Sequence, residues 1–83
     1  MSSQGRILIV EDDTSVRTML ATYLGEHGYE VIAVDRGTAM REAVERSLPD
    51  VVLLDVNLPG EDGLTLARYL RERYDVGIII VTG

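Results

Sequence analysis

The chain has 83 residues, of which 46 % are apolar and 27 % are charged, values typical of one small globular domain. It contains no cysteine, which excludes disulfides, thiolate nucleophiles and cysteine-ligated zinc. The net charge of −6 argues against nucleic-acid binding by this segment, because phosphate contacts require clustered basic side chains.

No apolar run approaches the roughly 18 residues that a membrane-spanning helix needs. The N-terminal residues MSSQGR lack the apolar core of a signal peptide. We therefore expect a cytoplasmic protein without a membrane segment.

The first half of the chain predicts a strand, a helix and a second strand. RILIV, residues 6–10, is a continuous apolar run of the kind found in strands buried on both faces. From Thr14 the apolar residues follow a helical period, and Gly28 is expected to end this helix as its C′ residue. EVIAV, residues 30–34, predicts the second strand. The expected inner stripe of the first helix comprises Val16, Met19, Leu20, Tyr23 and Leu24.

The second half continues the same alternation. A helix is expected over residues 38–47, before Pro49. VVLLD, residues 51–55, predicts a strand, and NLPGEDG, residues 57–63, the loop after it. A third helix is expected over 63–73 and a fourth strand over 76–82. The residues expected to face inward are Met40, Ala43, Val44 and Leu48 in the second helix and Leu64, Ala67 and Leu70 in the third.

Strands that alternate with helices predict right-handed crossovers and a parallel sheet. The continuously apolar strands favour a doubly wound α/β fold, with helices on both faces of the sheet. Ligands of such folds bind beyond the carboxyl ends of the strands, where the strand order reverses. The polar residues that end the strands are therefore the candidates for a functional site.

Three carboxylates and a hydroxyl lie at these strand ends. Glu11 and Asp12 follow the first strand, Asp55 closes the third, and Thr82 closes the fourth. Two carboxylates about 4 Å apart repel each other by roughly 4 kcal/mol at an effective dielectric near 20. The chain has no lysine, and the one arginine that follows a strand end is Arg36. A hard divalent cation with oxygen ligands, above all Mg²⁺, is therefore expected to offset the repulsion.

Each position also has a simpler interpretation. Asp12 or Asp13 is well placed to cap the first helix. Asp55 precedes a Pro-Gly turn and would serve there as a turn residue, and Thr82 is a common residue type in strands. The joint placement of the acidic residues, not any single one, favours the metal site.

The chain resembles the receiver domain of two-component response regulators. The resemblance lies in ILIVEDD, Arg17 in the first helix, DVVLLDVNLPGEDGL and IIIVTG. The resemblance covers the chain from Arg6 to Gly83. It implies a flavodoxin-like fold with strand order 2-1-3-4-5, a signalling module rather than an enzyme, and a sensor histidine kinase as partner.

The resemblance also implies roles for individual residues. Asp55 matches the residue that accepts a phosphoryl group from the kinase's phosphohistidine. Asp12 matches a direct Mg²⁺ ligand and Glu11 one that acts through water, while Asn57 matches the residue whose backbone carbonyl binds the metal. Thr82 matches the hydroxyl that moves toward the phosphoryl oxygens. Further matches are Asp13 as a helix cap, Pro59 and Gly60 as the turn at the site's rim, and Gly63 as the start of the third helix.

The chain departs from the family pattern after the fourth strand. The family pattern continues there with a helix, a fifth strand and a last helix, whereas this sequence ends at Gly83. We therefore interpret residues 1–83 as a partial receiver domain without an output domain. The lysine and the aromatic switch residue of strand five are absent, so phosphoryl transfer is expected to be impaired. Strand four then forms an open edge beside a partly uncovered sheet face, which predicts self-association, most simply as a dimer.

Other functions remain as alternatives. A haloacid-dehalogenase-type enzyme also uses a strand-end aspartate with Mg²⁺, but it needs a second acid where this chain has Asn57. A dinucleotide-binding unit needs glycines where this chain has EDDTSVR. A structural, self-associating fragment with a vestigial site is the main alternative. Arg17, His27 and Arg36 are interpreted as solvated surface residues.

Overall fold

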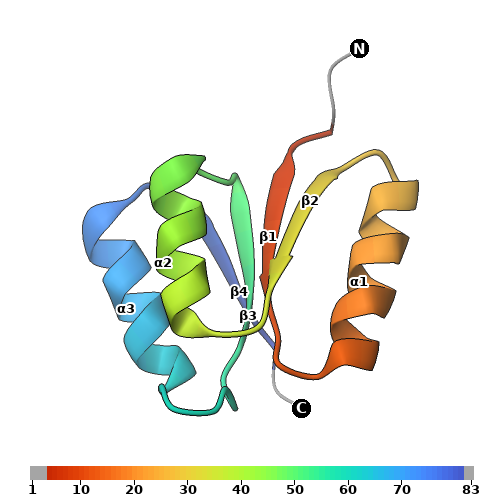
Figure 1. The fold of residues 1–83 in the computed structure, drawn as a ribbon. Coiled ribbons are helices and arrows are strands. Elements are labelled where there is room, and N and C mark those ends of the chain that lie inside the picture. Colours follow the sequence, from red (N-terminus) through yellow and green to blue (C-terminus); the bar gives the residue numbers. More distant parts are fainter. Residues whose placement is uncertain (1–3, 82–83) are drawn as a thin grey trace.

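The structure, a computed structural model, describes residues 4–81. Strands and helices alternate through this range, as the sequence predicts (Figure 1). No helix in the described range has the length and apolar character required to cross a membrane. The elements are β1 (Arg6–Val10), α1 (Thr14–Glu26), β2 (Glu30–Val34), α2 (Gly37–Arg46), β3 (Val51–Asp55), α3 (Gly63–Arg73) and β4 (Gly77–Val81).

The four strands form one parallel sheet with the order β2-β1-β3-β4. Helices α2 and α3 cover one face of this sheet and α1 lies on the other (Figure 1). The predicted doubly wound α/β fold is confirmed. Because the chain runs from β1 outward to β2 and then back to β3, the strand order reverses between β1 and β3, and the carboxyl ends of these two strands flank the expected ligand position.

The main core lies between the sheet and the α2/α3 layer. β1 and β3 contribute Leu8, Val10, Val52 and Leu54, all at most 1 % exposed. The helices and the loop before α3 contribute Met40, Val44, Leu58, Leu66, Ala67 and Leu70. This contiguous apolar cluster fixes both strands that end at the candidate site.

Two of the residues expected to face inward on these helices lie outside the core. Leu48 is 46 % exposed, because α2 ends at Arg46 and Ser47 is already extended, so Leu48 is not on the helix. Leu64 is 59 % exposed, and Leu66 occupies the core position instead. At 3.6 residues per turn, Leu64 points roughly 120° away from the buried Leu70.

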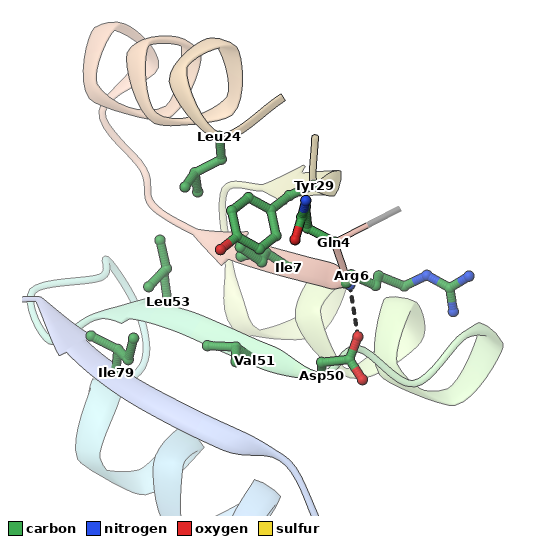
Figure 2. Close-up of a pocket in the computed structure, with 10 residues that line it drawn as sticks. Gln4, Arg6, Ile7, Leu24, Tyr29, Asp50, Val51, Leu53 and Ile79 are labelled. Carbon is green, nitrogen blue, oxygen red and sulfur yellow. Dashed lines mark hydrogen bonds between the residues drawn. The ribbon is translucent and has the colours of Figure 1, made fainter. Parts of the chain in front are cut away.

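The α1 face of the sheet is packed less completely. α1 has no buried residue, and Met19 and Tyr23 are 60 % and 57 % exposed, so the expected inner stripe is wrong at these two positions. The half-buried apolar residues of α1 are Val16, Leu20, Ala21 and Leu24. A groove of about 340 Å³ remains beside α1, with Leu24, Leu53 and Ile79 along its apolar wall (Figure 2).

Glycine sets the end of α1 and the start of α3. Gly28, at φ 91°, follows the C-cap His27, which confirms the predicted C′ glycine. Gly63 begins α3 close to the end of β3. A Cβ atom at Gly63 would lie 2.5 Å from Val56 Cα and 2.7 Å from the Asp55 carbonyl oxygen. Only a residue without a side chain lets α3 begin this close to Asp55.

We therefore expect Gly63→Ala to lower the free energy of unfolding by about 1–3 kcal/mol, because α3 must move away from the end of β3. Gly25→Ala, in α1, is the matched control, since a Cβ there meets no atom within 4 Å. It should raise stability by roughly 0.5–1 kcal/mol through helix propensity. Urea unfolding followed by circular dichroism measures both changes. Equal stability of the two variants would contradict the close approach.

Candidate metal centre

The three candidate carboxylates lie together at the carboxyl ends of β1 and β3. Val10 of β1 pairs with Leu54 of β3, so Glu11, which follows β1, and Asp55, which ends β3, lie side by side. One carboxylate oxygen from each of Glu11, Asp12 and Asp55 lies within 4.8 Å of the other two. Glu11 and Asp55 are buried, whereas Asp12 is exposed to solvent. The convergence expected from the sequence is therefore observed.

Backbone N–H groups orient two of these carboxylates. The Asp13 N–H donates to Glu11 Oε2 at 3.1 Å, and the Asn57 N–H donates to Asp55 Oδ1 at 3.0 Å. The three ion pairs found among residues 4–81 involve none of the three acids. The cluster thus holds close negative charges that are oriented but not neutralised by a basic side chain of the described part.

The pKa of Glu11 is raised above its usual value, chiefly by burial. A hydrogen bond with Asp55 and the negative charges of Asp55 and Asp12 also raise this pKa, whereas the hydrogen bond from the Asp13 N–H lowers it. A raised pKa means that the ionised form of Glu11 destabilises the fold. Hard divalent cations prefer carboxylate oxygens, and a cation at this position would relieve the repulsion. The donor set therefore fits Mg²⁺.

Asp13 has a structural role. Its Oδ1 accepts a hydrogen bond of 3.0 Å from the Val16 N–H, and Asp13 is the N-cap of α1. The predicted capping role of Asp13 is confirmed. Because Asp13 supplies the cap, the Asp12 carboxylate is not used for capping.

Arg17 does not behave as the solvated surface residue that we expected. Its Nη1 donates to the backbone carbonyl of Glu11 at 2.9 Å and to that of Asp12 at 3.4 Å. The guanidinium group thereby holds the loop that presents the two acids. Its position in the first turn of α1, one turn after the cap, was the available sequence signal. Arg36 is exposed and pairs with Asp35, and His27 is also exposed, as expected.

The loop between β3 and α3 forms the rim of the site. Asn57 is exposed, and its expected role as a carbonyl ligand stays a prediction. Gly60 adopts φ 81°, in agreement with the expected turn after Pro59. Leu58 is buried and anchors the loop in the core. This role was not predicted, although an apolar residue before proline in an otherwise polar loop could have indicated it. Thr82 lies outside the described residues, so its role also stays a prediction.

The response regulator receiver domain family matches residues 7–83 of the chain. The chain belongs to this family, whose members are signalling modules rather than conventional enzymes.

Curated relatives are transcriptional regulators of bacteria. The chain is 44 % identical over 88 residues to the transcriptional regulatory protein AruR of Pseudomonas aeruginosa, covering 100 % of this chain and 36 % of the relative. It is 47 % identical over 77 residues to the TorCAD operon regulatory protein TorR of Escherichia coli, covering 93 % of the chain and 34 % of the relative. The chain thus spans about a third of the length of these relatives.

Solved structures show the same fold. The BeF₃-activated N-terminal receiver domain of Klebsiella pneumoniae RstA matches with a TM-score of 0.87 and 45 % identity, covering 93 % of this chain and 66 % of that one. The response regulator TrrA of Thermotoga maritima, solved in complex with Mg²⁺ and BeF, matches with a TM-score of 0.86 and 35 % identity, covering 93 % and 68 %. The flavodoxin-like receiver fold expected from the sequence is therefore confirmed.

We expect Glu11→Gln to stabilise the metal-free protein by roughly 1 kcal/mol at neutral pH, a fraction of the about 4 kcal/mol Coulomb repulsion between two carboxylates 4 Å apart. The stability of the wild type should fall as pH rises through the raised pKa of Glu11, because the folded state disfavours the ionised form. Glu11→Gln should remove this slope. Urea unfolding between pH 4 and pH 8 measures it.

Glu72→Gln is the control, since Glu72 is an exposed residue of α3. It should leave the pH dependence of stability unchanged. If Glu11→Gln also leaves that dependence unchanged, the repulsion within the cluster does not lower the free energy of unfolding.

Proposed function

We propose that this chain is the phosphoacceptor module of a cytoplasmic two-component system, with Asp55 as the residue that takes a phosphoryl group from the phosphohistidine of a sensor kinase. Mg²⁺ is held by Glu11, Asp12, Asp55 and the backbone carbonyl of Asn57. The observation that supports this most directly is the convergence of three carboxylates within 4.8 Å at the ends of β1 and β3.

In this reaction a carboxylate oxygen of Asp55 bonds to phosphorus while the phosphorus–nitrogen bond of phosphohistidine breaks and the imidazole leaves. The Asn57 N–H fixes the orientation of the Asp55 carboxylate through Oδ1. The position of Asp55 at the end of a central strand limits its motion further. A bound Mg²⁺ would neutralise charge on the transferring group. Thr82 is the proposed hydroxyl that responds to the modified state.

Asp55→Ala should abolish phosphorylation by a small phosphoryl donor such as acetyl phosphate, measured as the loss of the one-phosphoryl mass increase. It should also weaken Mg²⁺ binding by at least about tenfold, because one ligand is lost. Calorimetric titration with Mg²⁺, alone and with beryllofluoride, measures this second effect.

Asp75→Asn is the control, because Asp75 is exposed and precedes β4, at the opposite end of the sheet from the acidic cluster. It should behave as the wild type does. Two results would favour the alternative function of a structural fragment with a vestigial site. One is that Asp55→Ala responds to acetyl phosphate, Mg²⁺ and beryllofluoride as the wild type does, and the other is that the wild type responds to none of them.

We further propose that the chain self-associates through β4 and the neighbouring sheet face. β4 lies at one edge of the described sheet, and Ile79 and Ile80 are 52 % and 38 % exposed. The groove beside α1 adds apolar surface from Leu53 and Leu24 next to Ile79 (Figure 2). An edge strand of the described sheet next to exposed apolar side chains favours pairing with a second copy.

Ile79→Lys should weaken the dimer by at least about tenfold, because it places a charge in the apolar contact. Sedimentation velocity across a range of protein concentrations measures this dissociation constant. Leu64→Lys is the control, since Leu64 is also exposed but belongs to α3, which covers the opposite face of the sheet from α1. A wild type that remains monomeric at high micromolar concentration would contradict the proposal.

A further inference from the structure

Among the points that fix the loop after Asp55, residues 56–62, three lie at its start, in its middle and near its end. At its start the Asn57 N–H bonds the Asp55 carboxylate, and in its middle Leu58 is buried in the core. Near its end the Glu61 carboxylate binds Arg41 of α2. Between the second and third points, Gly60 adopts φ 81° and a Cβ atom there would contact nothing within 4 Å. The Glu61 contact fixes the second half of the loop together with Asp62, the N-cap of α3, whose Oδ1 accepts from the Leu64 N–H.

The geometry of the Glu61–Arg41 pair is that of a bidentate ion pair. Arg41 Nη1 donates to Glu61 Oε1 at 3.0 Å, and Nη2 donates to Oε2. The side chains are 29 % and 31 % exposed, so water screens the pair only partly. The hydrogen bond to Arg41 lowers the pKa of Glu61. Paired, parallel hydrogen bonds of this kind restrict direction as well as distance.

Neighbouring residues give this pair a defined place. The Arg41 guanidinium carbon lies 4.9 Å from the centre of the Tyr69 ring of α3, a cation–π arrangement. Gly37, the first residue of α2, leaves room for the Glu61 carboxylate, because a Cβ atom there would lie 2.3 Å from Oε1. The pair thus joins α2, α3 and the loop, where an ion pair on open surface would join only two flexible side chains.

The second half of the loop also borders the acidic cluster. Pro59 and Gly60 line a hollow of about 350 Å³ together with Asp12. The same two residues line an adjoining hollow of about 290 Å³ together with Glu61. A displacement of Glu61 would therefore move the wall that faces Asp12, and through Asn57 it would disturb the Asp55 carboxylate.

We propose that Arg41 and Glu61 are positioning residues, which hold the loop over residues 56–62 in the conformation that keeps Asp55 aligned with the other two acids. The part of this proposal that concerns metal affinity rests on the proposed function. The part that concerns the loop does not. Neither residue contacts the acidic cluster itself, so both act through the backbone of the loop.

The test compares Glu61→Gln with Glu30→Gln in the same 83-residue chain. Glu30 pairs with Arg6 at 3.1 Å on the surface of β1 and β2, and these residues lie at the starts of their strands, away from the acidic cluster. Glu30→Gln thus also removes one negative charge and one ion pair, but without touching the loop. Amide hydrogen exchange at Asn57 is measured without metal, and the Mg²⁺ dissociation constant is measured by titration of amide chemical shifts.

Glu61→Gln should speed exchange at Asn57 and weaken Mg²⁺ binding by roughly threefold to tenfold each, a range consistent with loss of a half-buried bidentate pair. Glu30→Gln should change neither quantity. The charge exchange Arg41→Glu with Glu61→Arg should recover part of both losses, which a general loss of stability would not allow. Exchange at Asn57 that responds equally to Glu61→Gln and Glu30→Gln would overturn the proposal.

The outcome also separates this inference from the proposed function. If Glu61→Gln speeds exchange at Asn57 but the wild type binds no Mg²⁺, the positioning role is supported and the metal site is contradicted. Mg²⁺ binding by the wild type that Glu61→Gln leaves unchanged would support the metal site and overturn the positioning role.

Discussion

Repulsion between carboxylates at the ends of two central strands is the constraint on which the structure of this chain depends. The pairing of Val10 with Leu54 places Glu11 and Asp55 side by side, and both side chains are buried. Burial strengthens the repulsion, because it removes the water that would screen it. A cation is the ligand that such a cluster binds at the lowest cost to the fold.

The surroundings of the cluster are built to hold it against this repulsion. On the β1 side, Asp13 caps α1 and Arg17 bonds the carbonyls of the acidic loop, so the first turn of α1 is tied to the site. On the β3 side, Gly63 lets α3 begin in contact with Asp55, and Leu58 anchors the loop in the core. Each of these contacts restrains the backbone and leaves the carboxylate oxygens available.

The sequence predicted the strands and the three acids, because apolar runs and strand-end charges are local signals. The strand order was implied by the resemblance to receiver domains. The predictions from the sequence were wrong at residues whose burial or hydrogen-bond partners depend on tertiary contacts. Met19 and Tyr23 share the helical period of α1 but are exposed, since α1 contacts the sheet along a narrower line than the period implies. Leu66 is buried in place of Leu64, because the position at which α3 begins determines which side of the helix faces the core. The role of Arg17 was missed because its partners are backbone carbonyls, so that its position one turn after the cap was the one available signal.

The edge strand and the site belong to one hydrogen-bond network. Asp55 pairs with Val81 of β4, and the Val56 N–H donates to the Val81 carbonyl at 3.3 Å. The first residue of the loop after Asp55 is therefore bonded to the end of the strand that carries the exposed apolar side chains. A shift of β4 along or away from β3 must alter the backbone at Val56, one residue from the carboxylate. The proposed association at this edge and the alignment of the acids at the strand ends would thus be mechanically connected through one pair of adjacent strands.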